Sequence, residues 1–308
     1  MKRLKYHFDE IEECNFCGNK TIDNRILGQR LDKSQGLDPK RKSGITVSVI
    51  QCAKCSLVYS NPQPIPFDIQ DHYGVPPEAY WKEEYFLHDP DYFSEQVSKA
   101  KELVSFRSGM TALDVGAGLG KAMISLENSG FDTFGVEPSV PFRDRAISRM
   151  NIDPDRLKLG GVEDVDYEKN SFDFITFGAV LEHLSEPAQS IRKALEWLKP
   201  NGIIQIEVPS SRWLISRIVN SYYRVRGTNF VTNISPMHNP FHMYEFDLKS
   251  FETLAERLNF EIVEYAYSVC SIYHIPRFFH PIFRWYMEKF DRGMQLTVWL
   301  RKPAHTGN

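Results

Sequence analysis

The sequence has 308 residues, of which 42% are hydrophobic and 13% aromatic, and a formal net charge of −3. A chain of this size can bury a full α/β core beside a small accessory module, and its charge offers no chain-wide attraction to nucleic acid, which is therefore not the expected partner. Because no stretch approaches the roughly 18 uncharged apolar residues of a membrane span and the N-terminus lacks the apolar run of a signal peptide, we expect a cytoplasmic protein without an integral membrane segment.

Four of the five cysteines form two CxxC pairs near the N-terminus, Cys14 with Cys17 and Cys52 with Cys55. Two such pairs on short turns supply four thiolates in tetrahedral array, so the spacing predicts a closed, structural Zn²⁺ site. We expect residues 1–62 to form a zinc-ribbon-like module, with a strand at 46–50 that leads into the second pair. A redox dithiol, an iron–sulfur site and free core cysteines are the alternatives.

Residues 63–110 are expected to be a linker and lid segment. Three prolines in five positions, Pro62, Pro64 and Pro66, cannot continue a helix or a central strand. An aromatic stretch at 80–86 follows, and residues 94–105 are expected to form a helix. The aromatic rings, including Tyr85, can cover a cationic cofactor, although ordinary packing is the alternative.

From residue 111 onward, strand-like and helix-like segments alternate, as in a parallel sheet wrapped by helices. We therefore expect a Rossmann-like, doubly wound domain over 111–308. The expected strands are 111–115, 133–136, 172–177, 202–208, 261–267 and 295–300, and the expected helices are 122–129, 141–150, 187–198 and 248–258.

A glycine-rich loop follows the first of these strands directly. Gly116, Gly118 and Gly120 lack a Cβ and tolerate positive φ, so the backbone can approach a ligand closely. The dinucleotide fingerprint GxGxxG requires a further glycine at position 121, which is Lys121. The loop therefore predicts a nucleotide-like cofactor but departs from the dinucleotide pattern.

Two acidic residues narrow the choice of cofactor. Asp114 lies just before the glycines and would repel a pyrophosphate, whereas S-adenosylmethionine carries an ammonium and a sulfonium and no phosphate. Glu137 ends the next expected strand, 21 residues after Gly116, where a carboxylate can accept hydrogen bonds from ribose hydroxyls. The pattern favours S-adenosylmethionine.

Several motifs in order resemble those of class I S-adenosylmethionine-dependent methyltransferases, in the ubiquinone-biosynthesis-like branch, over about residues 95–302. They are the glycine loop, Glu137-Pro138, and the segments 161–164, 171–175, 180–184 and 198–202. The resemblance implies a mostly parallel seven-stranded sheet and a turn at Glu163 and Asp164 that contacts adenine. The full set of expected cofactor-binding residues is Asp114, Gly116, Gly118, Gly120, Glu137, Pro138, Glu163, Asp164, Phe177 and Tyr85.

Two histidines are the candidates for catalysis. Methyl transfer is an in-line displacement, so the protein mainly positions the acceptor and, for a hydroxyl or carbon acid, removes a proton. His183 follows the fourth strand, whose carboxyl end faces the cofactor, and His242 lies in a long insertion at 209–247. The alternatives are that His183 braces its loop and that His242 docks the insertion on the sheet.

The expected methyl acceptor is a small molecule. The arrangement resembles methyltransferases with paired CxxC motifs that modify nucleotide-linked sugars or other small molecules. An RNA methyltransferase is the main alternative, because Arg25, Arg30, Lys33, Lys40, Arg41 and Lys42 can contact phosphate. A non-catalytic binding protein is another. The aromatic and basic stretches at 213–226 and 277–287 are expected to form pocket walls or a homodimer contact, with a membrane surface as the alternative.

Overall fold

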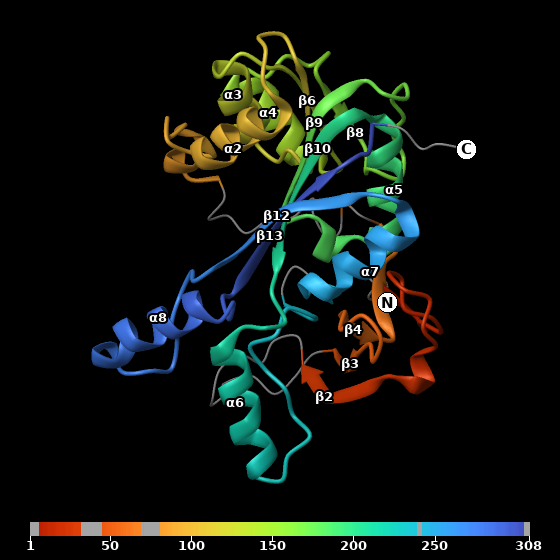
Figure 1. Ribbon diagram of the computed structural model, residues 1–308, viewed down its shortest axis with the longest axis vertical. Helices are drawn as coiled ribbons and strands as arrows, with labels where there is room; N and C mark the ends of the chain where they lie inside the picture. The colour runs from red at the N-terminus through yellow and green to blue at the C-terminus, as the bar shows by residue number, and fades with distance from the viewer. Residues whose placement is uncertain (1–5, 32–44, 69, 71–80, 239–241, 305–308) are drawn as a thin grey trace, which may run out of the picture.

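The computed structural model describes residues 6–31, 45–68, 70, 81–238 and 242–304 (Figure 1). A seven-stranded sheet with the order β12-β13-β10-β9-β6-β7-β8 forms its centre. Strand β13 is antiparallel to both neighbours and the others are mutually parallel, which confirms the predicted fold class. The strands are β6 (Thr111–Val115), β7 (Asp132–Glu137), β8 (Leu157–Leu159), β9 (Phe172–Gly178), β10 (Leu198–Pro209), β12 (Glu261–Ser268) and β13 (Gln295–Arg301).

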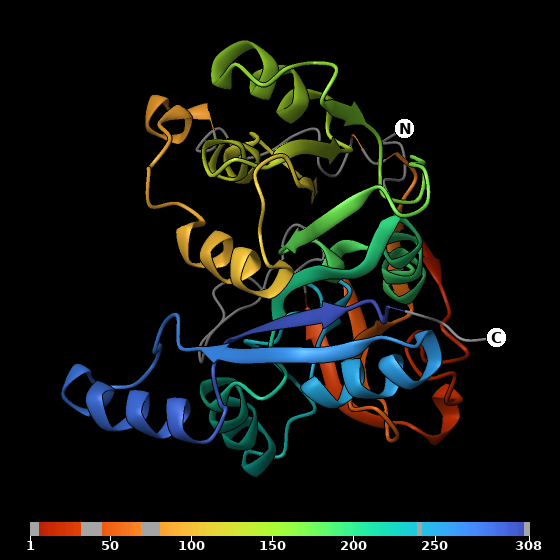
Figure 2. The same cartoon turned by 45° about the horizontal axis from the view of Figure 1, so that its top comes forward.

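Helices cover both faces of this sheet, so its central strands are apolar on both sides. Leu113 and Phe177 pack on one face, and Ala112 and Phe174 on the other. Figures 1 and 2 show α2, α3 and α4 on one side of the sheet and α5 and α7 on the other. These helices are α2 (Ser94–Val104), α3 (Lys121–Asn128), α4 (Val140–Met150), α5 (Pro187–Trp197) and α7 (Leu248–Leu258).

The N-terminal region contributes two small antiparallel sheets. One pairs β1 (Tyr6–Asp9) with β5 (Gln63–Pro66), and the other has the order β11-β4-β3-β2. The strands of this four-stranded sheet are β2 (Arg25–Leu31), β3 (Thr46–Gln51), β4 (Val58–Asn61) and β11 (Tyr244–Glu245). Since β11 comes from the 209–247 insertion and pairs with β4, the expected boundary at residue 62 separates strands that share one sheet.

Two further helices form a projecting lobe. Helix α6 (Leu214–Val225) follows β10, and α8 (His280–Lys289) lies between β12 and β13. They share a buried cluster that includes Val219, Tyr223 and Met287, and the Leu214 amide donates to the Arg292 carbonyl at 3.2 Å. Figure 1 shows both helices extending away from the central sheet. The stretches 213–226 and 277–287 are therefore mainly helical, which the sequence did not predict.

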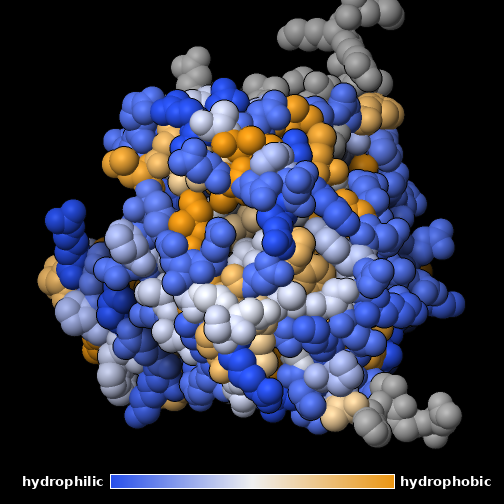
Figure 3. All heavy atoms as spheres, turned by 90° about the horizontal axis from the view of Figure 1, so that it is seen from above, coloured by the Kyte–Doolittle hydropathy of each residue, from blue (hydrophilic) through white to orange (hydrophobic). Residues whose placement is uncertain are grey.

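One face of the molecule shows how polar and apolar side chains are distributed on its surface. Figure 3 shows the face seen from above, where hydrophilic side chains predominate and hydrophobic ones gather in patches between them. Such mixing is usual on folded domains, since much of any protein surface is apolar. Among the described residues, no helix combines the length and the apolar character needed to cross a bilayer.

Candidate active site and metal centre

The glycine loop links the end of β6 to the start of α3. All three glycines have positive φ, 75° at Gly116, 56° at Gly118 and 76° at Gly120. A Cβ at Gly116 would lie 2.5 Å from Val180 Cγ2, and one at Gly120 would lie 2.6 Å from Ile152 Cγ1. Among the described residues, no heavy atom lies within 4 Å of a Cβ placed on Gly118. Glycine is therefore required by packing at two positions, while the backbone at Gly118 is open to a ligand.

Two buried carboxyl groups flank this loop. Glu137 accepts hydrogen bonds from the Gly118 amide at 2.7 Å and the Ser139 amide at 2.8 Å, one through each oxygen. Burial and, after it, the negative charge of Glu137 raise the pKa of Asp114 to about 7. Each carboxylate oxygen has a second lone pair, so Glu137 can also accept from a ligand hydroxyl. This environment disfavours an anion and favours a cation beside Asp114.

The turns that follow β7 and β8 lie at the carboxyl edge of the sheet, as the glycine loop does. Gln70 donates to the Pro138 carbonyl at 2.7 Å and accepts from the Val140 amide at 3.1 Å, which fixes the turn after Glu137. Asp164 accepts from the Gly161 amide at 3.2 Å in the turn after β8, where both it and Glu163 are exposed. These side chains are open to a ligand at the carboxyl edge of the sheet.

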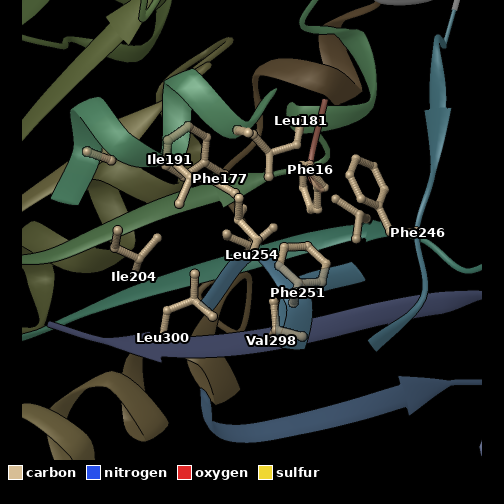
Figure 4. Packing of buried hydrophobic residues seen from close by; sticks show 14 of the residues in the cluster. Phe16, Phe177, Leu181, Ile191, Ile204, Phe246, Phe251, Leu254, Val298 and Leu300 are labelled. Atoms are coloured by element: carbon tan, nitrogen blue, oxygen red, sulfur yellow. The ribbon is translucent and has the colours of Figure 1, made fainter. Parts of the chain in front are cut away.

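The aromatic residues are placed in two different ways. Tyr85 is 37% exposed and its ring lies 5.9 Å from Lys121 Nζ, next to the glycine loop. Phe177 is fully buried and packs in the apolar cluster with Leu181, Ile191 and Leu254 (Figure 4). In this structure the side chain of Phe177 has no exposed surface and contributes to the core, whereas the ring of Tyr85 is accessible. Tyr80, the first ring of the expected lid, lies outside the described residues.

Three acidic residues come together at the carboxyl ends of β6, β9 and β10, and the sequence interpretation had included only Asp114. Burial and, to a smaller extent, the charge of Glu207 raise the pKa of Glu182 to about 8. The pKa of Tyr92 is also raised, first by burial and then by the charges of Asp114 and Glu207. The available signal was position in the sequence: Glu207 is the penultimate residue of a predicted strand, and Glu182 directly precedes His183.

The insertion brings its histidine to the end of β9. The His183 and His242 rings are in edge-to-face contact, with centroids 4.4 Å apart. Ser235 Oγ lies 2.8 Å from His242 Nδ1, and the Met243 amide donates to the Glu182 carbonyl at 2.6 Å. The two residues proposed separately from sequence thus form one pair, a proximity that the sequence could not indicate.

Glu182 completes a cluster with these histidines. Ligand atoms of Glu182, His183 and His242 all lie within 4.8 Å of one another. Within the described part of the chain, the buried Glu182 Oε2 has no hydrogen-bond partner. Imidazole nitrogens with a carboxyl group can accept a proton from a substrate or hold a divalent cation. The chemistry available here is therefore proton transfer or electrophilic assistance beside the glycine loop.

The four N-terminal cysteines form a buried cluster of free thiols. The Sγ atoms of Cys14 and Cys55 are 3.5 Å apart, those of Cys17 and Cys52 are 3.4 Å apart, and all four lie within 4.8 Å of one another. Zinc–sulfur bonds of about 2.3 Å in a tetrahedron place sulfurs about 3.8 Å apart. Contact with Cys52, followed by burial, raises the pKa of Cys14 to about 12. Donor type, number and spacing thus fit Zn²⁺, whose charge would hold the thiolates.

The cysteine turns lie directly against the α/β domain. Asn15, between the first two cysteines, accepts a hydrogen bond from the Ala188 amide at 2.8 Å, at the start of α5. Phe16 packs against Phe246 and Phe251, with ring centroids 5.6 Å away in each case (Figure 4). Ser250 of α7 donates to the Cys55 carbonyl at 3.0 Å. The cysteine turns therefore support α5, the helix that follows the His183 segment.

Comparison with known families decides the identity of the α/β domain. The sequence model of a family described as a methyltransferase domain matches residues 87–265, more than half of the chain. The chain belongs to this methyltransferase family. The sequence-based assignment to S-adenosylmethionine-dependent methyltransferases is thereby confirmed. The cysteine turns and the α8 segment lie outside the matched part of the methyltransferase chain.

Individual relatives of this methyltransferase are distant. A tRNA U34 carboxymethyltransferase from Desulfotalea psychrophila is 26% identical over 185 residues, which cover 56% of this chain and 53% of the relative. A ubiquinone biosynthesis O-methyltransferase from Bradyrhizobium diazoefficiens is 27% identical over 109 residues, 34% of this chain and 42% of the relative. The chain thus spans about half the length of the curated relatives it matches.

A solved structure of an S-adenosylmethionine-dependent methyltransferase from Archaeoglobus fulgidus is also similar to this chain. The two are 15% identical, with a TM-score of 0.49, over 73% of this chain and all of the other.

Proposed function

We propose that the protein transfers a methyl group from S-adenosylmethionine to a hydroxyl or similarly acidic group of a small polar molecule, such as a sugar or nucleotide-linked sugar. The observation that carries the proposal is the pairing of His183 with His242 at the carboxyl edge of the sheet, beside the glycine loop. Val180, three residues before His183, lies against Gly116, so the histidine pair and the loop are neighbours.

The cofactor, when bound, supplies an electrophilic methyl group on a sulfonium. The chain's own residues would hold it at three points. The open backbone at Gly118 would admit its methionyl part, and Asp114 would attract the ammonium. Glu137, whose position is fixed by two backbone amides, would accept hydrogen bonds from the ribose hydroxyls. Tyr85 would cover the outer side.

Proton removal from the acceptor is assigned to the histidine pair. If Nδ1–H of His242 donates to Ser235 Oγ, the neutral tautomer carries its lone pair on Nε2, which can accept a proton. His183 lies in contact with that ring and would share the role. An acceptor that must lose a proton, such as a hydroxyl, suits this arrangement better than a neutral amine.

We assign a structural Zn²⁺ to Cys14, Cys17, Cys52 and Cys55, on the strength of their spacing and burial. With four protein ligands the ion would have no open position for a substrate, so its role would be to hold the two turns. Through their contacts with α5 and the hydrophobic core, Asn15 and Phe16 would then hold the two turns against the α/β domain.

The RNA alternative has weaker support. Arg30, one of the basic residues considered for phosphate contact, is fully buried and donates to Thr232 Oγ1 at 3.2 Å. Lys33, Lys40, Arg41 and Lys42 lie outside the described residues. One relative is named for tRNA, but the match covers about half of that protein. Small-molecule transfer therefore remains the first proposal.

The deciding experiment measures formation of S-adenosylhomocysteine in the presence of separate acceptor panels: sugars, nucleotide-linked sugars, small phenols and transfer RNA. The proposal expects turnover with a hydroxyl-bearing small molecule that is abolished in His183→Ala with His242→Ala. Turnover on RNA alone would overturn the small-molecule assignment, and tight cofactor binding without turnover on any panel would support a non-catalytic role.

A further inference from the structure

The lobe formed by α6 and α8 differs in charge from the rest of the chain. Residues 212–230 and 269–294 contain eight Arg or Lys and two acidic residues, a formal net charge of +6 in a chain whose total is −3. The remaining residues therefore carry −9. The basic residues are Arg212, Arg217, Arg224, Arg226, Arg277, Arg284, Lys289 and Arg292.

Helix α8 is apolar on the side that faces solvent as well as on the side that faces the protein. Met287 is buried and Phe283 is half-buried against the lobe core. On another side of the helix, Ile282 is 61% exposed, Trp285 54% and Tyr286 40%. This exposed apolar side lies beside a polar stripe that includes the Arg284–Glu288 ion pair, and exposed apolar side chains grouped in this way mark an interaction surface, so an occupant for this side is expected.

The segment before α8 and the end of α6 also expose apolar and aromatic side chains. Phe278, just before α8, is 75% exposed, and on α6 Val225 is 88% and Tyr222 45% exposed. Cationic groups lie over these rings, with Lys289 Nζ 4.9 Å from the Trp285 ring and the Arg226 guanidinium 5.6 Å from the Tyr222 ring. Aromatic and basic side chains thus alternate on one projecting structure.

We propose that the α6–α8 lobe docks this protein on the surface of an anionic lipid bilayer. Tyrosine, tryptophan and phenylalanine rings suit the boundary between headgroups and acyl chains, while Arg and Lys extend to the phosphates. Each basic residue near an anionic surface contributes about 1 kcal/mol. The lobe has both features, and its helices are too short to cross the bilayer.

A second copy of this chain is the other candidate occupant. In a two-fold symmetric dimer the same patch contacts itself, so a lobe of charge +6 would face another of +6. The charge thus opposes self-association through this surface and favours an anionic partner.

Docking in this way would also orient the site. Helix α6 follows the carboxyl end of β10, and the segment containing α8 follows the carboxyl end of β12, which runs parallel to β10. The glycine loop and His183 occupy the same edge of the sheet. Contact through the lobe would therefore bring the active-site edge close to the bilayer.

The test is flotation of the full-length protein with vesicles of phosphatidylcholine alone or mixed with phosphatidylserine. We expect binding to the mixed vesicles only, weakened by high salt. Arg224→Gln and Arg284→Gln should each lower the partition coefficient about fivefold, as about 1 kcal/mol per charge requires. Trp285→Ser with Ile282→Ser should abolish flotation, whereas Ile22→Ser, at a 90% exposed position elsewhere, should leave it unchanged.

Circular dichroism and cofactor binding of every variant check that the fold is intact. Absence of flotation with the wild-type protein on phosphatidylserine vesicles would overturn the proposal. A stable dimer that becomes monomeric in Trp285→Ser would overturn it as well, since a second copy would then cover the surface.

Discussion

Asp114→Asn should stabilise the cofactor-free protein at alkaline pH and weaken cofactor binding. The buried carboxyl has its pKa raised from 3.8 to about 7, so the folded state binds the proton more tightly than the unfolded state. The free energy of unfolding should therefore fall as the pH rises from about 4 to about 7. Above about pH 7 the buried carboxyl is ionised, and its full destabilising effect on the folded state is present. A shift of about three pKa units corresponds to about 4 kcal/mol.

The assay is urea unfolding of wild type and Asp114→Asn at several pH values between about 5 and 8. This range covers the upper part of the expected titration of Asp114 and the pH values just above it. The asparagine has the same shape and cannot ionise, so the variant should gain stability relative to wild type as the pH rises. Its affinity for S-adenosylmethionine should fall, because no negative charge remains for the ammonium. Equal pH dependence in the two proteins would refute the reasoning, since Asp114 would then titrate normally.

Three further predictions concern the metal, the docking of its turns and the histidine pair. Metal analysis should find about one zinc per chain, and Cys52→Ser should lose it and lower the unfolding free energy; a fully folded, zinc-free wild-type protein would contradict the site. Asn15→Ala should cost about 1 kcal/mol of stability in urea unfolding, because α5 loses a cap on its Ala188 amide, while a change at an exposed asparagine, Asn128→Ala, should cost less. His242→Ala should lower the methyl-transfer rate roughly a hundredfold or more without changing cofactor affinity in calorimetry; an unchanged rate would remove this residue from proton transfer.

Most of the α/β domain could be predicted because its signals are local. Strand β6, the glycine loop and α3 follow one another directly, and the buried run around Leu113 has the apolar character of a strand covered on both faces. Strand β8 has only three residues, too few for a periodic pattern, and was missed. Helices α6 and α8 were missed as well, although Arg217, Asn220 and Arg224 follow one another at helical spacing on α6.

The arrangement of the site depended on contacts between distant segments. The pairing of β11 with β4 joins segments about 180 residues apart, and it carries His242 towards His183. Nothing local in either segment encodes that contact. The burial of Glu182 and Phe177 likewise follows from packing of the complete sheet, which no local pattern in the sequence indicates.

Calorimetric titration with S-adenosylmethionine tests the central claim most directly. The wild-type protein should bind one cofactor per chain, and Glu137→Ala should weaken binding by roughly 1.5–3 kcal/mol, because ribose hydroxyls would lose a charged acceptor. Glu196→Ala, an exposed change at the end of α5, serves as the control and should bind normally. Unchanged affinity in Glu137→Ala, or no binding by the wild type, would contradict the assignment of this edge of the sheet as a methyltransferase cofactor site.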